Sequence, residues 1–277
     1  QRLRQPVRIV WSREESIIGH HKRHRVYARA RWAANSKGQL LAAESEVIGD
    51  AGAYVYTTNK VMGNTVLTVN GPYRIPNVKT DVIAAYTNNI PGGAFRGFGA
   101  PQGNFIAESQ MNKLAEALDM DPVTLRLRNI VGDGDPMPWG KPLPDDARGL
   151  KESLIAPARA MGWQPAEDEK ADDAEGSPSR WIAPTVERHA ADASYESRGI
   201  GIALAFKNVG FSFGYQENAW AGVELHGGSE IEKVVAFAAS ADVGQGARTV
   251  IRQMFAEALG VAIERIELRP ADTAITG

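Results

Sequence analysis

The sequence predicts an α+β fold made of two mixed blocks joined by a linker. Residues 1–162 and residues 199–277 each contain runs with the two-residue alternation of strands and runs with the three-to-four-residue spacing of helices. Between them, residues 163–198 contain the acidic, proline-punctuated run PAEDEKADDAEGSPS, which is typical of a linker or a surface excursion. We therefore expect two blocks and a connecting segment with these bounds.

The first block begins with strands. VRIVWS is apolar enough for a buried strand, and RVYARARWAA alternates as a half-exposed strand does. The turn NSKG leads into QLLAAESEVIGDAGAYV, with a bulge near Gly49 and Gly52, so these two runs form a long antiparallel hairpin. A further strand follows the proline-punctuated connection GPYRIPN. In order, the expected strands cover residues 7–12, 25–34, 39–55 and 78–87.

Helical periodicity dominates the rest of this block. PQGNFIAESQMNKLAEALDM carries a stripe that we expect to lie mostly in the core. The stripe consists of Phe105, Glu108, Met111, Ala115 and Leu118. Asp121 suits an N-cap and Pro122 a first helical position, so a second helix begins there. A third helix is interrupted at Pro157. The three helices cover residues 101–120, 121–131 and 149–163.

The second block combines a strand pair, a helix and a last strand. WAGVELH and EIEKVVAFAAS are joined through HGGS as a hairpin. The short loop ADVGQGA leads into the amphipathic run RTVIRQMFAEALGV, and IERIELRP follows as a strand. We expect the helix over residues 248–261 and the last strand over residues 263–270.

The composition argues against several classes of protein. A net charge of −2 leaves no dominant basic face, which argues against nucleic acid as a partner. The absence of cysteine excludes disulfides, thiolate-bound metals and an iron–sulfur cluster held by this chain. No apolar run approaches a membrane span, and QRLRQPVRIVW lacks a signal-peptide pattern. Because both ends fall within predicted architecture, we expect a segment of a longer chain.

The glycine-rich run GGAFRGFGAPQG, residues 92–103, is the first candidate site. It lacks the third glycine of a dinucleotide fingerprint and the Gly-Lys of a phosphate loop. A plain strand-to-helix turn would also explain its glycines. However, Phe98 lies between two glycines, Arg96 could serve an anion, and a helix N-terminus follows. These features together suit a flat, electron-rich or anionic ligand.

The loop ADVGQGA, residues 241–247, follows the same logic. Gly244 and Gly246 flank Gln245, whose amide offers one acceptor and two donors in a plane. A simple turn satisfied by its own backbone is the alternative. The histidines of HHKRH, residues 20–24, are crowded by basic side chains that would repel a metal cation, so we expect a solvated strand edge there.

GGAFRGFGAPQGNFIAESQMNKLAEALDMDPVTLRLRNI resembles the molybdenum-binding subunit of the xanthine dehydrogenase/aldehyde oxidase family. That family carries Ala-Phe-Arg-Gly-Phe-Gly-x-Pro-Gln, a helix with Glu, Asp-Pro and Arg-x-x-Asn in this order. RQPVRIVWSREE, PYRIPNV and ADVGQG with TVIRQMFAEALGV are similar to further family motifs. The resemblance covers residues 1–162 and 199–277. It implies a molybdenum hydroxylase that uses water-derived oxygen on an aldehyde or N-heterocyclic, purine-like substrate.

The resemblance also implies cofactors and partners. Molybdenum would be held by a pyranopterin, molybdopterin in its mononucleotide or cytosine dinucleotide form, which supplies the difficult chemistry. Electrons would pass to [2Fe–2S] and FAD centres in partner subunits or domains. We therefore expect a cytoplasmic hetero-oligomer, no protein ligand to the metal, and a small-molecule substrate.

Site residues follow from the same resemblance. Arg96 matches the cofactor-contacting arginine, and Phe98 matches the aromatic against the substrate ring. Gln245 matches the glutamine beside the molybdenum oxo ligand, and Gly244 and Gly246 let the backbone close around it.

Two further positions concern the substrate. Phe211 is assigned as a second substrate-facing aromatic. Asn64 stands where xanthine-type enzymes have a substrate-binding arginine, and an amide cannot offer that charge, so an aldehyde or another N-heterocycle is at least as well supported as a purine.

No catalytic residue is expected within the segment. The family's general-base glutamate would lie downstream, and Glu108, Glu217 and Glu224 stand in no matching motif. Three hypotheses remain. The chain is a segment of a catalytic subunit, a non-catalytic binding module that retains the scaffold, or an unrelated α+β domain whose glycine loops coincide.

Overall fold

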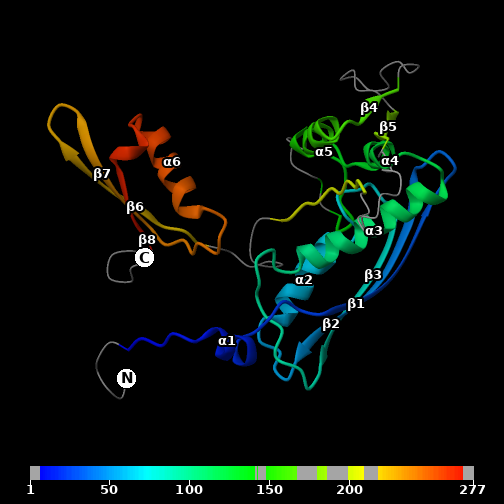
Figure 1. The fold of residues 1–277 in the computed structure, drawn as a ribbon, viewed down its shortest axis with the longest axis horizontal. Coiled ribbons are helices and arrows are strands. Elements are labelled where there is room, and N and C mark those ends of the chain that lie inside the picture. Colours follow the sequence, from blue (N-terminus) through cyan, green and yellow to red (C-terminus); the bar gives the residue numbers. More distant parts are fainter. Residues whose placement is uncertain are drawn as a thin grey trace, which may run out of the picture. The chain divides into compact units, whose positions relative to one another are not determined.

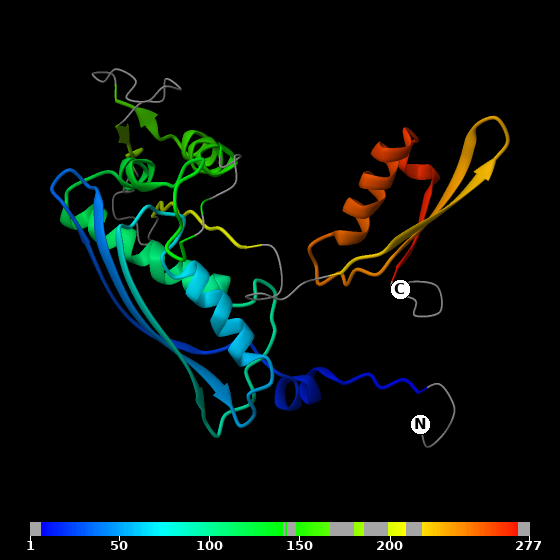
Figure 2. The same cartoon turned by 180° about the vertical axis from the view of Figure 1, so that it is seen from behind.

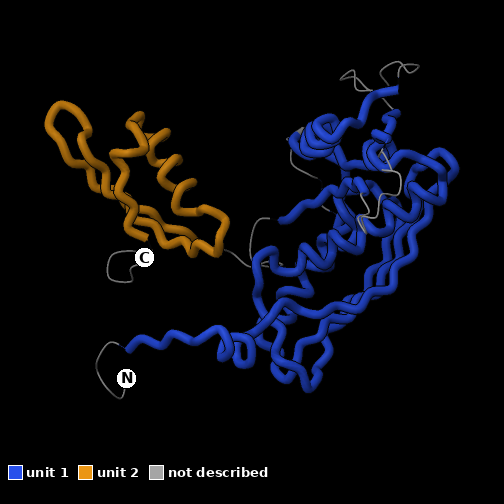
Figure 3. The backbone as a smooth tube through the Cα atoms, viewed as in Figure 1, with its two compact units in different colours: residues 1–213 blue, residues 214–277 orange. Residues whose placement is uncertain are grey.

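The computed structural model describes residues 7–140, 142, 148–166, 180–185, 199–208 and 218–270. The chain divides into two compact units, residues 1–213 and residues 214–277 (Figure 3). Each unit combines strands with helices, and the predicted α+β class is confirmed. The predicted domain bounds stay a prediction, because compactness alone does not define a domain.

A three-stranded sheet forms the base of the first unit. Its strands are β1 (Val26–Ala34), β2 (Leu40–Gly52) and β3 (Asn77–Tyr86), in the order β1-β2-β3. β1 and β2 form the predicted antiparallel hairpin, and β3 pairs with β2 in parallel. The register of β2 against β3 shifts between Asp50 and Gly52, which confirms a bulge near Gly52.

Helices α2 (Thr58–Thr68) and α3 (Ala100–Ala117) cover one face of this sheet (Figures 1 and 2). Alternate β2 residues, among them Ala43 and Val47, are buried on that face. A Cβ on Gly49 would lie 2.3 Å from the sulfur of Met62, so this glycine allows α2 to approach the sheet. Helix α2 was not predicted, because TNKVMGNTVLT has a glycine, three threonines and little amphipathic contrast.

Helix α3 confirms the predicted helix, with one exception in its stripe. Glu108, Met111 and Ala115 are buried, and Leu118 packs against the same core, whereas Phe105 is 75% exposed. Phe105 therefore lies on the outer side of α3 in this unit.

The N-terminal prediction was wrong. Residues 7–12 form no strand and are exposed, and α1 (Arg13–Gly19) follows them. Ser12 begins this helix with a capping box, because its Oγ accepts from the N–H of Glu15 while its own N–H donates to the Glu15 carboxylate. The Ser-x-x-Glu pattern in WSREES is the sequence signal for that cap.

A second cluster of buried side chains lies around two tryptophans. It involves α4 (Pro122–Asn129), α5 (Arg148–Ala160) and the strand pair β4 (Gln164–Pro165) and β5 (Trp181–Ile182). Asp121 caps α4 as predicted, and α5 continues through Pro157, so the predicted interruption was wrong.

Part of the predicted linker belongs to this cluster. Trp163 is 3% exposed and Trp181 is 1% exposed, so these flanks are not a solvated excursion. Most of the acidic run between them, residues 167–179, lies outside the described residues.

The second unit repeats the topology of the first sheet. Its elements are β6 (Ala221–Gly227), β7 (Ile231–Ala238), α6 (Ala247–Leu259), the 3₁₀ turn η1 (Ile263–Arg265) and β8 (Ile266–Pro270). β6 and β7 are antiparallel, and β8 pairs with β7 in parallel. The hairpin, the helix and the last strand confirm the predictions. Among the described residues, no helix is long and apolar enough to cross a membrane.

Candidate functional site

The glycine-rich run connects β3 to α3, and its first two glycines face the histidines of HHKRH. A Cβ on Gly92 would lie 2.4 Å from Cδ2 of His24, and one on Gly93 would lie 2.5 Å from Cδ2 of His21. No real side chain tolerates such contacts. These two positions are glycine because imidazole rings pack against the backbone.

The later glycines face helix α2. Gly99 has a φ of +97°, and a Cβ there would lie 2.2 Å from the carbonyl oxygen of Val61. A Cβ on Gly103 would lie 2.2 Å from Oγ1 of Thr68. Close packing between α3 and α2 therefore explains these two glycines, and the positive φ of Gly99 agrees with the strand-to-helix turn.

The side chains of Phe95 and Arg96, between the glycines, face outward. Phe95 is 52% exposed, Arg96 is exposed and Phe98 is half-buried. Phe98 has a φ of 47°, which is uncommon for a bulky residue. Gly99 gives α3 no side-chain cap. A guanidinium thus stands three residues before the N-cap of a helix without a side-chain cap, and both favour an anion.

The HHKRH segment lies beside this loop and is not the solvated strand edge that the sequence predicted. His24 is 4% exposed, and its Nε2 lies 2.9 Å from Oγ1 of Thr58. Burial lowers the pKa of His24, and the charges of His21 and Arg23 add to this, against the opposing effect of Asp50. The neutral imidazole is therefore the favoured form.

The second candidate loop lies in the other unit, between β7 and α6. Oδ1 of Asp242 accepts from the N–H of Gly244 at 2.8 Å, and this bond lowers the pKa of Asp242. Gly244 and Gly246 have φ values of 98° and 80°. A Cβ on Gly246 would meet nothing within 4 Å among the described residues, so its positive φ rather than close packing explains that glycine.

Gln245 bonds to its own loop. Its Oε1 accepts from the N–H of Val243 at 2.7 Å, and its Nε2 donates to the carbonyl of Ala241 at 3.0 Å. One amide hydrogen and one acceptor lone pair stay available for a ligand. Arg96 belongs to the first unit and Gln245 to the second.

The remaining predicted residues lie elsewhere. Asn64 is fully buried in α2, and Phe211 falls outside the described residues. The roles of all these side chains stay predictions. Sequence reasoning missed two contacts to the loop, from His21 to the carbonyl of Ala94 and from Arg23 to the carbonyl of Arg96, because no local pattern pairs positions more than 70 residues apart.

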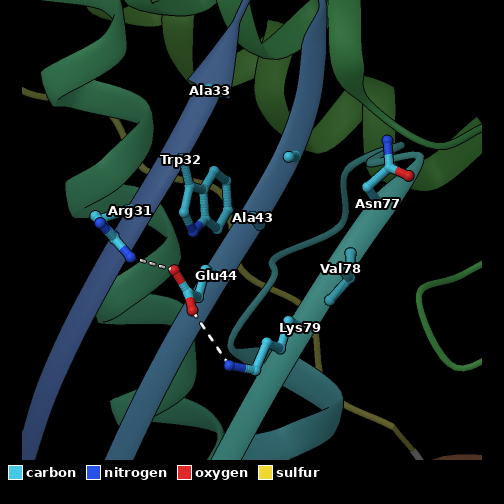
Figure 4. A pocket seen from close by; sticks show the side chains of 9 residues that line it. Arg31, Trp32, Ala33, Ala43, Glu44, Asn77, Val78 and Lys79 are labelled. Atoms are coloured by element: carbon cyan, nitrogen blue, oxygen red, sulfur yellow. Dashed lines mark hydrogen bonds and ion pairs between the residues drawn. The ribbon is translucent and has the colours of Figure 1, made fainter.

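A surface hollow on the first sheet contains none of the predicted site residues (Figure 4). Glu44 lies between Arg31 and Lys79, at 2.6 Å and 3.3 Å, so three adjacent strands carry one row of charges. All three side chains are solvent-exposed. Exposed ion pairs contribute little to the free energy of unfolding. This row of charges is therefore part of the sheet surface rather than a site.

Known proteins are similar to this chain in both sequence and fold. Two family models, each described as a molybdopterin cofactor-binding domain, match residues 1–130 and 178–277. The chain is 32% identical over 269 residues to a probable xanthine dehydrogenase subunit of Bacillus subtilis, and the match covers 97% of this chain and 32% of that protein. It is 41% identical over 151 residues to the nicotinate dehydrogenase large molybdopterin subunit of Eubacterium barkeri, covering 54% of this chain and 35% of the relative.

A solved structure has a similar fold. The aldehyde oxidoreductase from Desulfovibrio gigas aligns with a TM-score of 0.63 and 26% identity, over 92% of this chain and 26% of that one. The chain thus spans about a third or less of the length of these proteins. It belongs to the molybdopterin-binding family of molybdenum hydroxylases that includes the xanthine dehydrogenases and aldehyde oxidoreductases.

Proposed function

We propose that this chain forms part of the catalytic subunit of a molybdenum hydroxylase that oxidises an aldehyde or an N-heterocycle. The observation that carries this proposal is the exposed Arg96, held in the Ala-Phe-Arg-Gly-Phe-Gly loop at the uncapped N-terminus of α3. The relatives support both substrate classes, since they include a nicotinate dehydrogenase and an aldehyde oxidoreductase.

The residues present fit a molybdenum–pyranopterin cofactor. Both loops offer donors: the guanidinium of Arg96, an amide hydrogen of Gln245, and the N-terminus of α3, which has no side-chain cap. The carboxylate of Asp242 accepts from the N–H groups of Gly244 and Arg248, so these two donors near the start of α6 are already engaged. This donor set suits an oxygen-rich, negatively charged group. When bound, the cofactor supplies the hydroxylation and the two-electron redox chemistry.

In this proposal the chain binds and orients the cofactor and the substrate. Arg96 holds the cofactor, Gln245 donates beside it, Gly244 and Gly246 allow close approach, and Phe98 faces the substrate ring. Glu108 is not the general base, because both of its oxygens are occupied inside the protein. The electron acceptors, [2Fe–2S] and FAD, and a hetero-oligomeric assembly belong to the same proposal.

The test uses the intact protein that contains this chain. We expect purified wild type to contain molybdenum and to oxidise aldehydes or N-heterocycles, incorporating labelled oxygen from water. Arg96→Met should lower molybdenum retained after gel filtration about tenfold, because one charge-assisted hydrogen bond is lost. Arg29→Met, on exposed β1, is the matched control and should retain it. Absence of molybdenum from wild type would refute the proposal.

A non-catalytic binding module is the second candidate. The observation that favours it is the bonding of Gln245 to its own loop. A wild-type protein that retains molybdenum but oxidises neither substrate class would support this alternative.

A further inference from the structure

The HHKRH segment and the glycine-rich loop are about 70 residues apart in sequence and run side by side. The N–H of Lys22 donates to the carbonyl of Pro91 at 3.2 Å, and the N–H of Gly93 donates to the carbonyl of Lys22 at 2.9 Å. The two backbones therefore pair in parallel at Lys22 and Gly92. This pairing brings the side chains that flank Lys22 next to the residues after Gly93.

Two of those side chains bind loop carbonyls directly. Nε2 of His21 lies 2.8 Å from the carbonyl oxygen of Ala94, and Nη2 of Arg23 donates to the carbonyl of Arg96 at 2.6 Å. A carbonyl only accepts, so Nε2 of His21 carries the hydrogen. The guanidinium of Arg23 also lies 4.6 Å from the ring centroid of Phe95. The segment Ala94–Arg96 is thus held at both ends and over its middle residue.

The contacts of His21 and Arg23 with the loop are themselves anchored in the core. His24, one residue beyond Arg23, is buried and bonded to Thr58 at the start of α2. Gly92 and Gly93 admit the rings of His24 and His21 against the loop backbone. Any side chain at either glycine would push the two segments apart.

We propose that His21 and Arg23 are positioning residues that clamp the Ala94–Arg96 backbone and so fix the direction in which Arg96 and Phe98 face. The functional meaning of that direction rests on the proposed function. The clamp itself rests only on the contacts above. Neither residue needs to touch the ligand, because each acts on a main-chain carbonyl.

Hydrogen exchange of the intact protein tests the clamp. The amides of Gly93 and Phe98 report on it, since their acceptors are the carbonyls of Lys22 and Phe95. We expect His21→Ala and Arg23→Met each to accelerate exchange in the peptide over residues 92–98 about tenfold, with peptides of α3 and β2 unchanged. His21→Gln retains an N–H donor and should restore most of the protection.

A matched control variant and the pattern of exchange across the peptides decide whether the proposal holds. Arg29→Met removes a guanidinium from exposed β1 and should leave the loop unchanged. Unchanged exchange in both clamp variants, equal acceleration in α3 and β2, or failure of His21→Gln to restore protection would each overturn the proposal. If His21→Ala does not fold, Arg23→Met still decides, because Arg23 is only half-buried.

Molybdenum content in the same samples separates this proposal from the function. Faster loop exchange with unchanged molybdenum retention supports the clamp and counts against Arg96 as a cofactor ligand. Faster exchange with reduced retention supports both. Loop exchange that stays at the wild-type rate overturns the clamp whether or not wild type contains molybdenum.

Discussion

The carboxylate of Glu108 links three parts of the first unit at residue scale. It accepts from the hydroxyl of Tyr73, from Nε of Arg126 at 2.8 Å, and from the N–H of Leu204 at 2.7 Å. Asn104, one turn earlier on α3, bonds to the main chain of Phe206. Helix α3 therefore fixes the backbone of residues 204–206, just before the segment that contains the predicted Phe211.

The burial of the Glu108–Arg126 pair gives a stability prediction. Glu108→Gln leaves the guanidinium of Arg126, which has no exposed surface, without its counter-charge. We expect a loss of about 3 kcal/mol in the free energy of unfolding, measured by urea denaturation. Glu116→Gln on the exposed side of α3 is the control and should cost less than about 0.5 kcal/mol. Equal losses in the two variants would contradict a structural role for Glu108.

At the scale of elements, the helices and strands with a strong local sequence pattern were predicted, and those with a weak pattern were not. The period of α3 and α6, the Asp121-Pro122 start of α4 and the two hairpins are encoded within a few residues each. Helix α2 has no such pattern and is held by packing against α3 and β3. The apolar run at residues 7–12 has no partner strand among the residues that the structure describes, so its composition alone led to a wrong prediction.

The candidate site shows the same division. The family resemblance rests on local sequence motifs. The bounds of the glycine-rich loop and its residue Arg96 could therefore be predicted from the sequence. The partners of the loop glycines, His21, His24 and α2, were not, because tertiary contacts between distant segments leave no local pattern. The histidines were therefore assigned to solvent although His24 is buried.

Two helical glycines make this argument testable. Helix propensity alone predicts that alanine stabilises both Gly103 in α3 and Gly149 in α5. However, a Cβ on Gly103 would lie 2.2 Å from Oγ1 of Thr68, while one on Gly149 would meet nothing within 4 Å. We expect Gly103→Ala to destabilise by about 2 kcal/mol and Gly149→Ala to be neutral or slightly stabilising, measured by thermal unfolding. Stabilisation by Gly103→Ala would show that α2 can move away at low cost.

At the scale of the whole molecule, the two units share one topology. In each, an antiparallel hairpin is followed by a helix and a strand parallel to the second hairpin strand, in the orders β1-β2-β3 and β6-β7-β8. Such a shared topology requires only a similar hydrophobic pattern and not the same residues. Each unit also contains its own buried cluster in the described residues.

These separate clusters predict separate unfolding. Leu125 belongs to the cluster of the first unit and Val234 to that of the second, and both side chains have no exposed surface. Leu125→Ala should weaken protection against hydrogen exchange by about 3 kcal/mol in β2 and α3 only. Val234→Ala should do so by about 2 kcal/mol in β7 and β8 only. If either variant weakens both units equally in the intact protein, the two form one cooperative unit. A local response instead means that the two candidate loops, one in each unit, are held by independent cores.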